Sequence, residues 1–327
     1  MKGTASSRIL NRSIVKHIPA YGAGRASAGR DFAILEESEG SGQTMVLAEG
    51  YSVDSVLAYL RAKNNLAMSG ADPESITVSI VAGEDTPEST LRSEMLKLTD
   101  YAREKGIRII GGNTVYSGKG EEAAFTVTAY GKTEAAVLRQ LTSKPEAGDS
   151  IIIFGNAGQY GASVIAEKKR DELKVRFPES YMECFSFPME KLDVSGAAKM
   201  LIKAGVVMLH DISFGGVYRA LYDIADYSGL GLRILHECVP IEQSTIELSE
   251  YYGINPYMLL GTGGLIAVAR PDLPEDLLEQ ISQTTGISCR TAGKLTTDKK
   301  CEITSEVYEM RRSLGMYEED EIYKVLT

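Results

Sequence analysis

The clearest part of the hydrophobic pattern begins at Val53. Apolar side chains recur at helical spacing from Val53 to Met68, which keeps one stripe of a helix buried. Gly70 can adopt the left-handed conformation that closes a helix, and Asp72-Pro73 prevents its continuation. Ser75 to Val81 then alternates and is rich in β-branched side chains. The pattern therefore predicts a helix followed directly by a strand.

The rest of the chain alternates short apolar runs with longer amphipathic segments. The apolar runs predict strands at Phe32–Leu35, Thr44–Ala48, Ile107–Ile110, Ala123–Tyr130, Ile151–Phe154, Val206–Leu209, Gly231–Leu235 and Gly264–Ala269. The amphipathic segments predict helices at Glu88–Lys105, Met189–Ala204, Gly215–Tyr227, Ile241–Tyr251 and Glu275–Thr284. One further helix is predicted to end near Arg170. This mixture of strands with covering helices indicates an α/β or α+β fold.

Turn-forming residues separate the predicted elements. Tyr21 to Arg30 is rich in Gly and Ala without a hydrophobic period, so it predicts a flexible segment. Residues 171–188 are expected to be irregular, and residues 131–149 are typical of a turn-rich connection. We place a domain boundary in that connection and expect domains at residues 1–140 and 141–327.

Composition and charge exclude several classes of protein. The chain has 327 residues, 43% of them hydrophobic and 24% charged, as in a globular protein with room for two cores. A formal net charge of -10 argues against nucleic acid as a partner, and no apolar run is long enough for a membrane span. The first residues lack the apolar core of a signal peptide, so we expect a cytoplasmic protein. The four cysteines lack metal-site spacing and are expected to be free thiols.

Polar residues interrupt the pattern in the first half of the chain. Asn64 and Asn65 stand side by side on the predicted helix, which indicates either a side-chain role or a solvated face. Asp31 and Glu49 flank predicted strands, where carboxylates are ordinarily solvated. The motif GGNT, Gly111 to Thr114, follows a predicted buried strand, and its glycines either let the backbone approach a ligand or form a plain turn.

Glycine-rich turns mark the second half. GNAGQYGAS contains Gly158 and Gly161, and HDISFGG leads into a helix through Gly215 and Gly216. Backbone N–H groups at a helix start favour an anion, although such turns often mark only a tight connection between a strand and a helix. His210, at the end of a predicted strand, is either a core histidine or a functional one.

Together these segments resemble the superfamily of aminoimidazole ribonucleotide synthetase (PurM) and the HypE hydrogenase maturation factor. NNLAMSGADP is similar to N-D-L-A-x-x-G-A-x-P, GRDFAIL to G-D-D-A-A-V, AEG to T-D-G, and GGNT to G-G-[DE]-T. In the second half, GDSIIIFGNAGQYGAS and HDISFGGVYRAL are similar to the superfamily's glycine-rich segments, the latter closest to the HypE version. The resemblance covers residues 29 to 295, and the order of its segments is specific at superfamily level.

The resemblance implies a two-domain PurM/HypE-like fold, in which the N-terminal domain pairs its sheet across a homodimer and the C-terminal domain is α/β. It implies ATP as cofactor together with Mg²⁺, which neutralises charge developing on the phosphates. Asp31 and Glu49 are the implied metal ligands, and His210 and Asp211 the implied catalytic residues. The implied ligand-binding residues are Arg30, Lys63, Asn64, Asn65, Gly111, Gly112, Asn113, Thr114, Gly158, Gly161, Gly215 and Gly216.

This chain departs from the superfamily pattern at its acidic positions. Asn65, Asn113 and Arg30 replace carboxylates, and Lys63 stands where HypE proteins usually carry a small apolar residue. A neutral amide oxygen attracts Mg²⁺ weakly, whereas Arg and Lys bind phosphate directly. Two functions stay open. One is a HypE-related, ATP-dependent enzyme that phosphorylates or dehydrates an unknown small amide or phosphate, with a maturation-type partner protein. The other is a nucleotide- or anion-binding protein that has lost phosphoryl transfer.

Residues 319–327, EDEIYKVLT, contain no cysteine. HypE proteins carry a terminal cysteine that accepts a carbamoyl group, whereas Cys301 lies in an alternating stretch, CEITSEVYEM, that predicts a strand. We therefore expect no carbamoyl chemistry on these last residues, and we expect them to form a charged, flexible tail.

Overall fold

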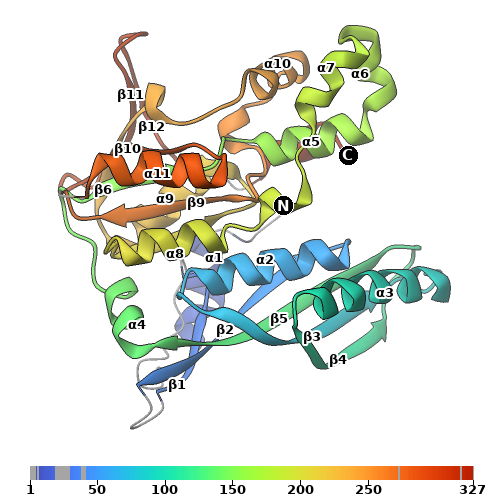
Figure 1. Ribbon diagram of the computed structural model, residues 1–327. Helices are drawn as coiled ribbons and strands as arrows, with labels where there is room; N and C mark the ends of the chain where they lie inside the picture. Colours follow the sequence, from blue (N-terminus) through green and yellow to red (C-terminus); the bar gives the residue numbers. More distant parts are fainter. Residues whose placement is uncertain are drawn as a thin grey trace. The chain divides into compact units, whose positions relative to one another are not determined.

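The computed structural model describes residues 5, 7–18, 30–37, 42–271, 273–316 and 319–326. In this structure the chain forms two compact units (Figure 1). The N-terminal unit contains residues 31–141, and the C-terminal unit contains residues from 142 onward together with helix α1 (Ser7–Ser13). Among the described residues, no helix is both long and apolar enough to cross a membrane.

A five-stranded sheet forms the N-terminal unit. Its strands lie in the order β1 (Ala33–Glu37), β2 (Gln43–Ser52), β5 (Ala123–Glu134), β3 (Asp72–Ala82) and β4 (Arg108–Tyr116). Strands β3 and β4 are parallel, and the other neighbours are antiparallel. Helices α2 (Ser55–Ala67) and α3 (Glu88–Glu104) lie on one face of this sheet (Figure 1), and α4 (Ala135–Leu141) follows β5. The opposite face, called the open face below, is not covered by these helices.

Helix α2 confirms the strongest prediction from the hydrophobic pattern. It begins where Asp54 Oδ1 accepts a hydrogen bond from the Leu57 N–H at 2.8 Å, an N-cap that satisfies one free donor of the first turn. It ends before Gly70, whose φ of 82° is the left-handed conformation expected there. Its apolar stripe is buried on the sheet through Tyr59, Leu60 and Leu66.

A seven-stranded sheet forms the centre of the C-terminal unit. Its strands lie in the order β12 (Met310–Ser313), β11 (Cys301–Ser305), β8 (Gly231–Leu235), β10 (Cys289–Thr296), β6 (Ser150–Phe154), β9 (Gly264–Ala269) and β7 (Met208–Ile212). The helices around it are α5 (Gln159–Lys168), α6 (Arg170–Arg176), α7 (Glu179–Met182), α8 (Ser195–Lys203), α9 (Gly216–Ser228), α10 (Gln243–Tyr252) and α11 (Glu275–Thr285).

Helices cover both faces of the central strands. Helix α9 packs through Val217 and Leu221 on the face that carries Ile151 and Ile153. Helix α11 lies against β10 on the other face (Figure 1). Strand β9 is buried along its whole length, which explains why its sequence is continuously apolar and why its bounds were predicted correctly.

Two predictions of irregular structure are wrong. Residues 171–188 contain α6 and α7, and the connection predicted at residues 131–149 begins with the end of β5 and with α4. The helix predicted at Met189–Ala204 is divided into a 3-10 helix at Met189–Leu192 and α8 from Ser195, with Asp193 extended between them. Asp193 Oδ1 accepts hydrogen bonds from the N–H and hydroxyl of Ser195 at 2.9 and 2.6 Å. The segment predicted to be flexible, Tyr21–Arg30, lies outside the described residues except for Arg30.

The strand predicted to be buried at Ile107–Ile110 is an exposed edge strand. Strand β4 runs from Arg108 to Tyr116, and Ile110 and Tyr116 are 58% and 55% exposed. The motif GGNT therefore lies inside a strand and does not follow one. A run of apolar residues does not show whether other parts of the same unit cover the strand. The sequence pattern therefore could not distinguish a buried strand from an exposed edge strand.

Candidate functional site

Strand register aligns polar side chains across the open face of the N-terminal unit. Glu49 on β2 lies opposite Thr128 on β5, and Thr128 lies opposite Thr77 on β3. One pair further along, Thr126 lies opposite Ser79. Directly opposite residues have Cβ atoms about 5 Å apart, so a carboxylate and four hydroxyls form one polar area. Only the sheet register brings these residues together, and their sequence spacing gives no sign of it.

One predicted metal ligand, Glu49, lies exposed on β2, and the other, Asp31, lies two residues before β1. Strand β1 pairs Ala33 with Leu47, and this antiparallel register, if continued before the first residue of β1, would set Asp31 opposite Glu49. Glu49 Oε1 also accepts a hydrogen bond from Thr128 Oγ1 at 3.3 Å. No cluster of three or more His, Cys, Asp or Glu that could hold a metal occurs in the described residues. A carboxylate pair nevertheless fits Mg²⁺, which commonly takes one or two carboxylates together with substrate phosphates.

The asparagines of α2 contact the protein itself. Asn64 is fully buried, so the solvated face considered for it is wrong. Asn65 is partly buried, and its Nδ2 donates to the Glu49 carbonyl oxygen at 2.8 Å. An aspartate at position 65 lacks this donor and would set a carboxylate against that carbonyl. Lys63 is partly exposed on the same helix. The ligand-binding roles of these three residues stay predictions.

The motif GGNT contributes one structural and several exposed residues. A Cβ on Gly112 would lie 1.9 Å from the Val78 carbonyl oxygen, so glycine is required here for close approach of β4 to β3. Gly111, Asn113 and Thr114 are exposed. Asn113 lies opposite Ser79, and β4 is three strand spacings, roughly 14 Å, from β2. Asn113 therefore does not share a metal with Glu49 within this sheet.

The glycine turns of the C-terminal unit contact a loop of the same unit, residues 256–261. Gly161 N–H donates to the Leu260 carbonyl oxygen at 2.9 Å, and Gly216 N–H donates to the Ser213 carbonyl oxygen at 3.2 Å. Added Cβ atoms would lie 2.5 Å from the Pro256 oxygen at Gly158, and 2.6 Å from the Leu259 oxygen at Gly216. These contacts show that close packing requires glycine at each turn. The binding of phosphate by these glycine turns stays a prediction.

The predicted catalytic pair lies on the edge strand of the second sheet. His210 and Asp211 belong to β7, pair with Ile266 and Leu265 of β9, and are each 7% exposed. Arg30, also assigned to a ligand, donates from Nη2 to the Tyr227 hydroxyl of α9 at 3.3 Å. Burial of His210 agrees with both of its interpretations, so its catalytic role stays a prediction.

Asp320 is a polar residue of this unit that the sequence analysis missed. Its carboxylate, predicted to lie in a flexible tail, is buried and accepts the Gly215 N–H at 2.6 Å. Burial raises the pKa of Asp320 to about 6, although hydrogen bonds from the N–H groups of Gly215, Ile322 and Leu260 oppose this shift. The run of charges from Glu319 to Glu321 indicated a solvated tail, so local sequence carried no signal of burial.

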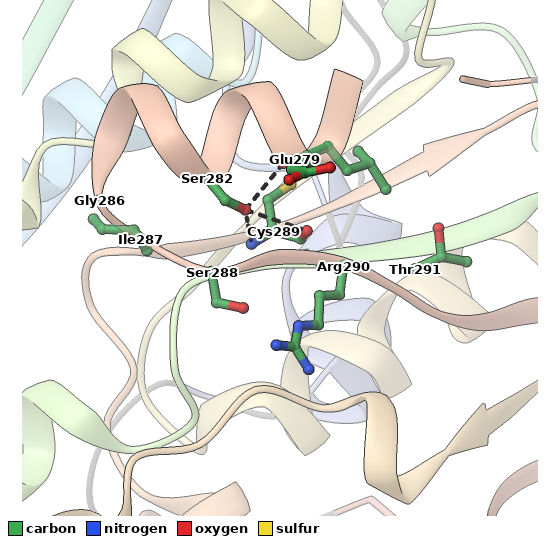
Figure 2. Close-up of a pocket in the computed structure, with 9 residues that line it drawn as sticks. Glu279, Ser282, Gly286, Ile287, Ser288, Cys289, Arg290 and Thr291 are labelled. Carbon is green, nitrogen blue, oxygen red and sulfur yellow. Dashed lines mark hydrogen bonds between the residues drawn. The ribbon is translucent and has the colours of Figure 1, made fainter. Parts of the chain in front are cut away.

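A groove of about 680 Å³ lies between α11 and β10 (Figure 2). Ser282 Oγ accepts the Cys289 N–H at 2.9 Å, and Arg290 points away from α11. Burial raises the pKa of the Cys289 thiol to about 12, so this thiol stays protonated and unreactive at neutral pH. None of the predicted site residues lines this groove.

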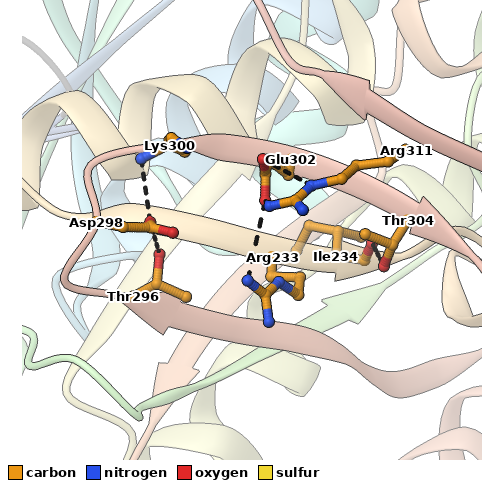
Figure 3. Close-up of polar contacts among 8 residues, drawn as sticks. All are labelled: Arg233, Ile234, Thr296, Asp298, Lys300, Glu302, Thr304 and Arg311. Carbon is orange, nitrogen blue, oxygen red and sulfur yellow. Dashed lines mark hydrogen bonds and ion pairs between the residues drawn. The ribbon is translucent and has the colours of Figure 1, made fainter.

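A charged cluster attaches the β11–β12 hairpin to β8 (Figure 3). Arg311 donates to both oxygens of Glu302, from Nε at 2.8 Å and from Nη2 at 2.5 Å, and Arg233 Nη2 lies 3.9 Å from the same carboxylate. The Arg311 guanidinium holds the pKa of Glu302 below its usual value. Cys301 begins β11, which confirms the strand predicted over CEITSEVYEM only as far as Ser305, because residues 306–309 form a turn. Burial raises the pKa of the Cys301 thiol.

Two α/β units, each built on its own sheet, match the two domains of a single protein family. The N-terminal domain of the family described as AIR synthase related protein matches residues 29–133, and the C-terminal domain matches residues 146–306. The chain belongs to this AIR synthase related family, and the PurM/HypE-like resemblance and fold class predicted from the sequence are confirmed.

Individual relatives carry the name HypE. The chain is similar to carbamoyl dehydratase HypE of Cupriavidus necator, with 28% identity over 72% of this chain and 65% of that protein, just under two thirds of its length. Among solved structures, that of a HypE–HypF complex has a TM-score of 0.71 at 24% identity, covering 88% of this chain and 93% of that one. HypE in complex with ATP has a TM-score of 0.69 at 18% identity, covering 98% and 97%. These structures share the fold.

Proposed function

We propose that this protein binds ATP and acts as a HypE-related, ATP-dependent enzyme on a small amide or phosphate substrate. The observation that carries the proposal is the exposed Glu49 carboxylate on the open face, beside the strand that Asp31 precedes by two residues. A solved HypE with the same fold is described as a complex with ATP, which supports the choice of nucleotide.

The residues of the open face have distinct tasks in this proposal. Asp31 and Glu49 hold Mg²⁺, which when bound neutralises charge on the nucleotide phosphates. Thr128 donates to Glu49 and so orients its carboxylate. The Asn65 side-chain amide donates a hydrogen bond to the Glu49 backbone carbonyl oxygen. This contact limits the movement of Glu49 as a metal ligand. The hydroxyls of Thr77, Ser79 and Thr126 face the same side and offer donors to phosphate oxygens.

A second copy of the chain completes the open face in our proposal. Strand β4 is an edge strand with exposed Ile110, Val115 and Tyr116, and an exposed apolar edge is ordinarily covered. We therefore expect a homodimer, with a mass twice that of the 35.5 kDa chain by light scattering. A maturation-type partner belongs to the proposal as well, since a HypE relative is described in complex with HypF. A monomer at micromolar concentration would contradict the paired sheet.

Carbamoyl chemistry on Cys301 is not part of the proposal. Cys301 is half-buried at the start of a strand, and burial raises its pKa, so its reactive thiolate is scarce. Mass spectrometry after incubation with ATP and a carbamoyl-transferring partner is expected to show no adduct. A carbamoyl or cyano group on Cys301 would overturn this statement.

A second candidate function is nucleotide or anion binding without phosphoryl transfer. The neutral amides of Asn65 and Asn113 favour it, because Asn65 is used as a structural donor and Asn113 lies far from the carboxylate pair. The decisive experiment measures ADP release with Mg²⁺ against a panel of amides and phosphates. Wild-type turnover that is lost in Glu49→Gln and kept in Glu134→Gln, an exposed carboxylate of the same sheet, supports the enzyme. Nucleotide binding without ADP release supports the second candidate.

A further inference from the structure

The loop of the β11–β12 hairpin exposes two adjacent apolar side chains. Strand β11 pairs with β8 as far as Thr304 opposite Leu235, and the loop residues 306–309 follow beyond this pairing (Figure 1). Val307 and Tyr308 in this loop are 70% and 71% exposed. Single exposed apolar residues are ordinary, whereas two neighbours on one loop form a shared apolar surface. We call residues 306–309 the hairpin tip.

Hydrogen bonds fix the backbone of the hairpin tip. Glu237, just after β8, accepts hydrogen bonds from the Ser305 hydroxyl and, at 3.2 Å, from the Val307 N–H. Ser305 is buried, and its Oγ accepts the Tyr308 N–H at 3.0 Å. The hydrogen bond from the Ser305 hydroxyl holds the pKa of Glu237 below its usual value, so this acceptor is ionised at neutral pH. The N–H groups of both exposed apolar residues are therefore held in place.

The base of the hairpin is attached to the sheet by charged groups. Arg311 on β12 donates to both carboxylate oxygens of Glu302 on β11, at 2.8 and 2.5 Å (Figure 3). A loop that is fixed before binding loses less conformational entropy than a mobile loop with the same residues. Aromatic side chains in fixed positions are the usual anchors of protein interfaces. The hairpin tip combines such an aromatic residue with an aliphatic neighbour on a fixed backbone.

Carboxylates flank the apolar pair on both sides. Glu306 precedes it and Glu309 follows it, and both are exposed. Glu309 has a φ of 47°, a left-handed conformation in which glycine or asparagine is usual and a glutamate is strained. Strained residues of this kind occur preferentially at functional sites. The strain indicates that the carboxylate of Glu309 contributes to the surface of the tip.

The charge of the hairpin tip selects its partner. Two carboxylates repel phosphate groups, so neither nucleic acid nor an anionic membrane surface complements the tip. A second copy of the chain is also a poor match, because each chain carries a formal net charge of -10. The complementary surface is an apolar pocket bordered by Lys and Arg side chains on a different protein.

We propose that the hairpin tip is a docking element that inserts Val307 and Tyr308 into an apolar pocket of a partner protein, where basic side chains at the rim pair with Glu306 and Glu309. Tyr308 is the main anchor, because truncated aromatic anchors cost an interface the most. The docking element lies in the C-terminal unit and uses no residue of the open face. It goes beyond the proposed function, and docking requires no nucleotide.

Photocrosslinking on the full chain identifies the partner. The photoreactive amino acid p-benzoylphenylalanine is incorporated at position 307 in cells of the source organism, and at position 175 as a control, since Val175 on α6 is 90% exposed. We expect one protein to be crosslinked from position 307 and not from position 175. The crosslinked protein is then purified and titrated against the full-length wild type by calorimetry without nucleotide. Capture alone does not support the proposal, whereas tip-dependent binding of the purified protein does.

Variants of the full chain separate the anchor, the fixed backbone and the charges. Tyr308→Ser is expected to weaken binding at least about thirty-fold, the size typical of an interface anchor. The control Val175→Ser should bind as wild type does. Ser305→Ala keeps both apolar side chains but removes the hydrogen bonds that fix them, and should weaken binding by about three-fold to ten-fold.

The charged rim is tested with salt. Glu306→Gln combined with Glu309→Gln should weaken binding several-fold at low salt, and the difference from wild type should shrink at high salt. Equal affinity of wild type and Tyr308→Ser would overturn the proposal, as would crosslinking only to a second copy of the chain or to the same proteins from both positions. Binding that needs Tyr308 but responds neither to the two glutamates nor to salt would overturn the assigned class of partner.

Discussion

The open face of the N-terminal unit and the β7–α9 turn of the C-terminal unit both carry polar groups at motif positions, but those groups have different partners. On the open face, Glu49 is exposed, and its carboxylate accepts a hydrogen bond from the Thr128 hydroxyl. At the turn, the N–H groups of Gly215 and Gly216 donate to acceptors of the protein. One region leaves polar side chains exposed at its surface, and in the other the N–H groups are paired within the protein.

This difference shows how motif residues of one family divide between binding and packing. Gly112 and Gly216 both match the superfamily pattern, yet in each case an added Cβ would meet a carbonyl oxygen of the same unit. Such glycines maintain the backbone path whether or not a ligand is bound. A motif match therefore identifies a location, and the local contacts decide whether its atoms are available.

The largest expected effect is on the free energy of unfolding, when one glycine in each region is replaced by alanine. Gly216→Ala sets a Cβ 2.6 Å from the Leu259 carbonyl oxygen at a φ of 62°, so we expect a loss of about 3 kcal/mol or more in the free energy of unfolding. Gly111→Ala on the open face meets its nearest atom at 4.0 Å and is expected to change stability by less than about 1 kcal/mol. Denaturant titration compares them, and equal losses would remove the distinction between the regions.

A smaller effect is expected from pH through Asp320. Its pKa is about 6 in the folded protein against 3.8 ordinarily, so the folded state takes up this proton more readily than the unfolded chain. The resulting stabilisation is present at low pH and is lost as pH rises through about 6, on the order of 2 kcal/mol. The free energy of unfolding of wild type minus that of Asp320→Asn is measured from pH 4 to 7. A difference that grows with pH would contradict the buried environment.

Binding on the open face should fall by about a factor of ten when Glu49 loses its charge, because Mg²⁺ requires carboxylate oxygen. Glu49→Gln is compared with Glu134→Gln by calorimetry with ATP, with and without Mg²⁺. We expect the loss in Glu49→Gln alone and only with Mg²⁺ present. Equal affinity in both variants would show that the carboxylate pair does not bind the metal.

The smallest expected effect concerns Asn65. Asn65→Asp removes the hydrogen bond to the Glu49 carbonyl oxygen and should lower the free energy of unfolding by about 1 kcal/mol. Asn113→Asp, on the exposed edge strand, should leave stability unchanged. If Asn65→Asp is as stable as wild type, the amide is free for a ligand after all.

Local sequence predicted those elements whose burial is decided within a short segment. The bounds of β8 and β9 were predicted as observed, and α2 and β3 were placed within three residues at each end. Their apolar periods carry the information because each segment packs its own stripe. The strand β4 was wrongly predicted to be buried, because its apolar residues are exposed at the edge of the sheet and an apolar run alone does not distinguish an edge strand from a central one.

The sequence by itself determined the family, the α/β class and the positions of the candidate motifs, since each depends on residues close together along the chain. Tertiary structure alone decided which motif atoms are available. Glu49 meets the Thr128 hydroxyl through strand register, and Asp320 meets the N–H groups of Gly215 and Leu260 from 105 and 60 positions away. A charged run looks solvated in sequence because the donors that stabilise a buried carboxylate come from distant backbone, which no local pattern records.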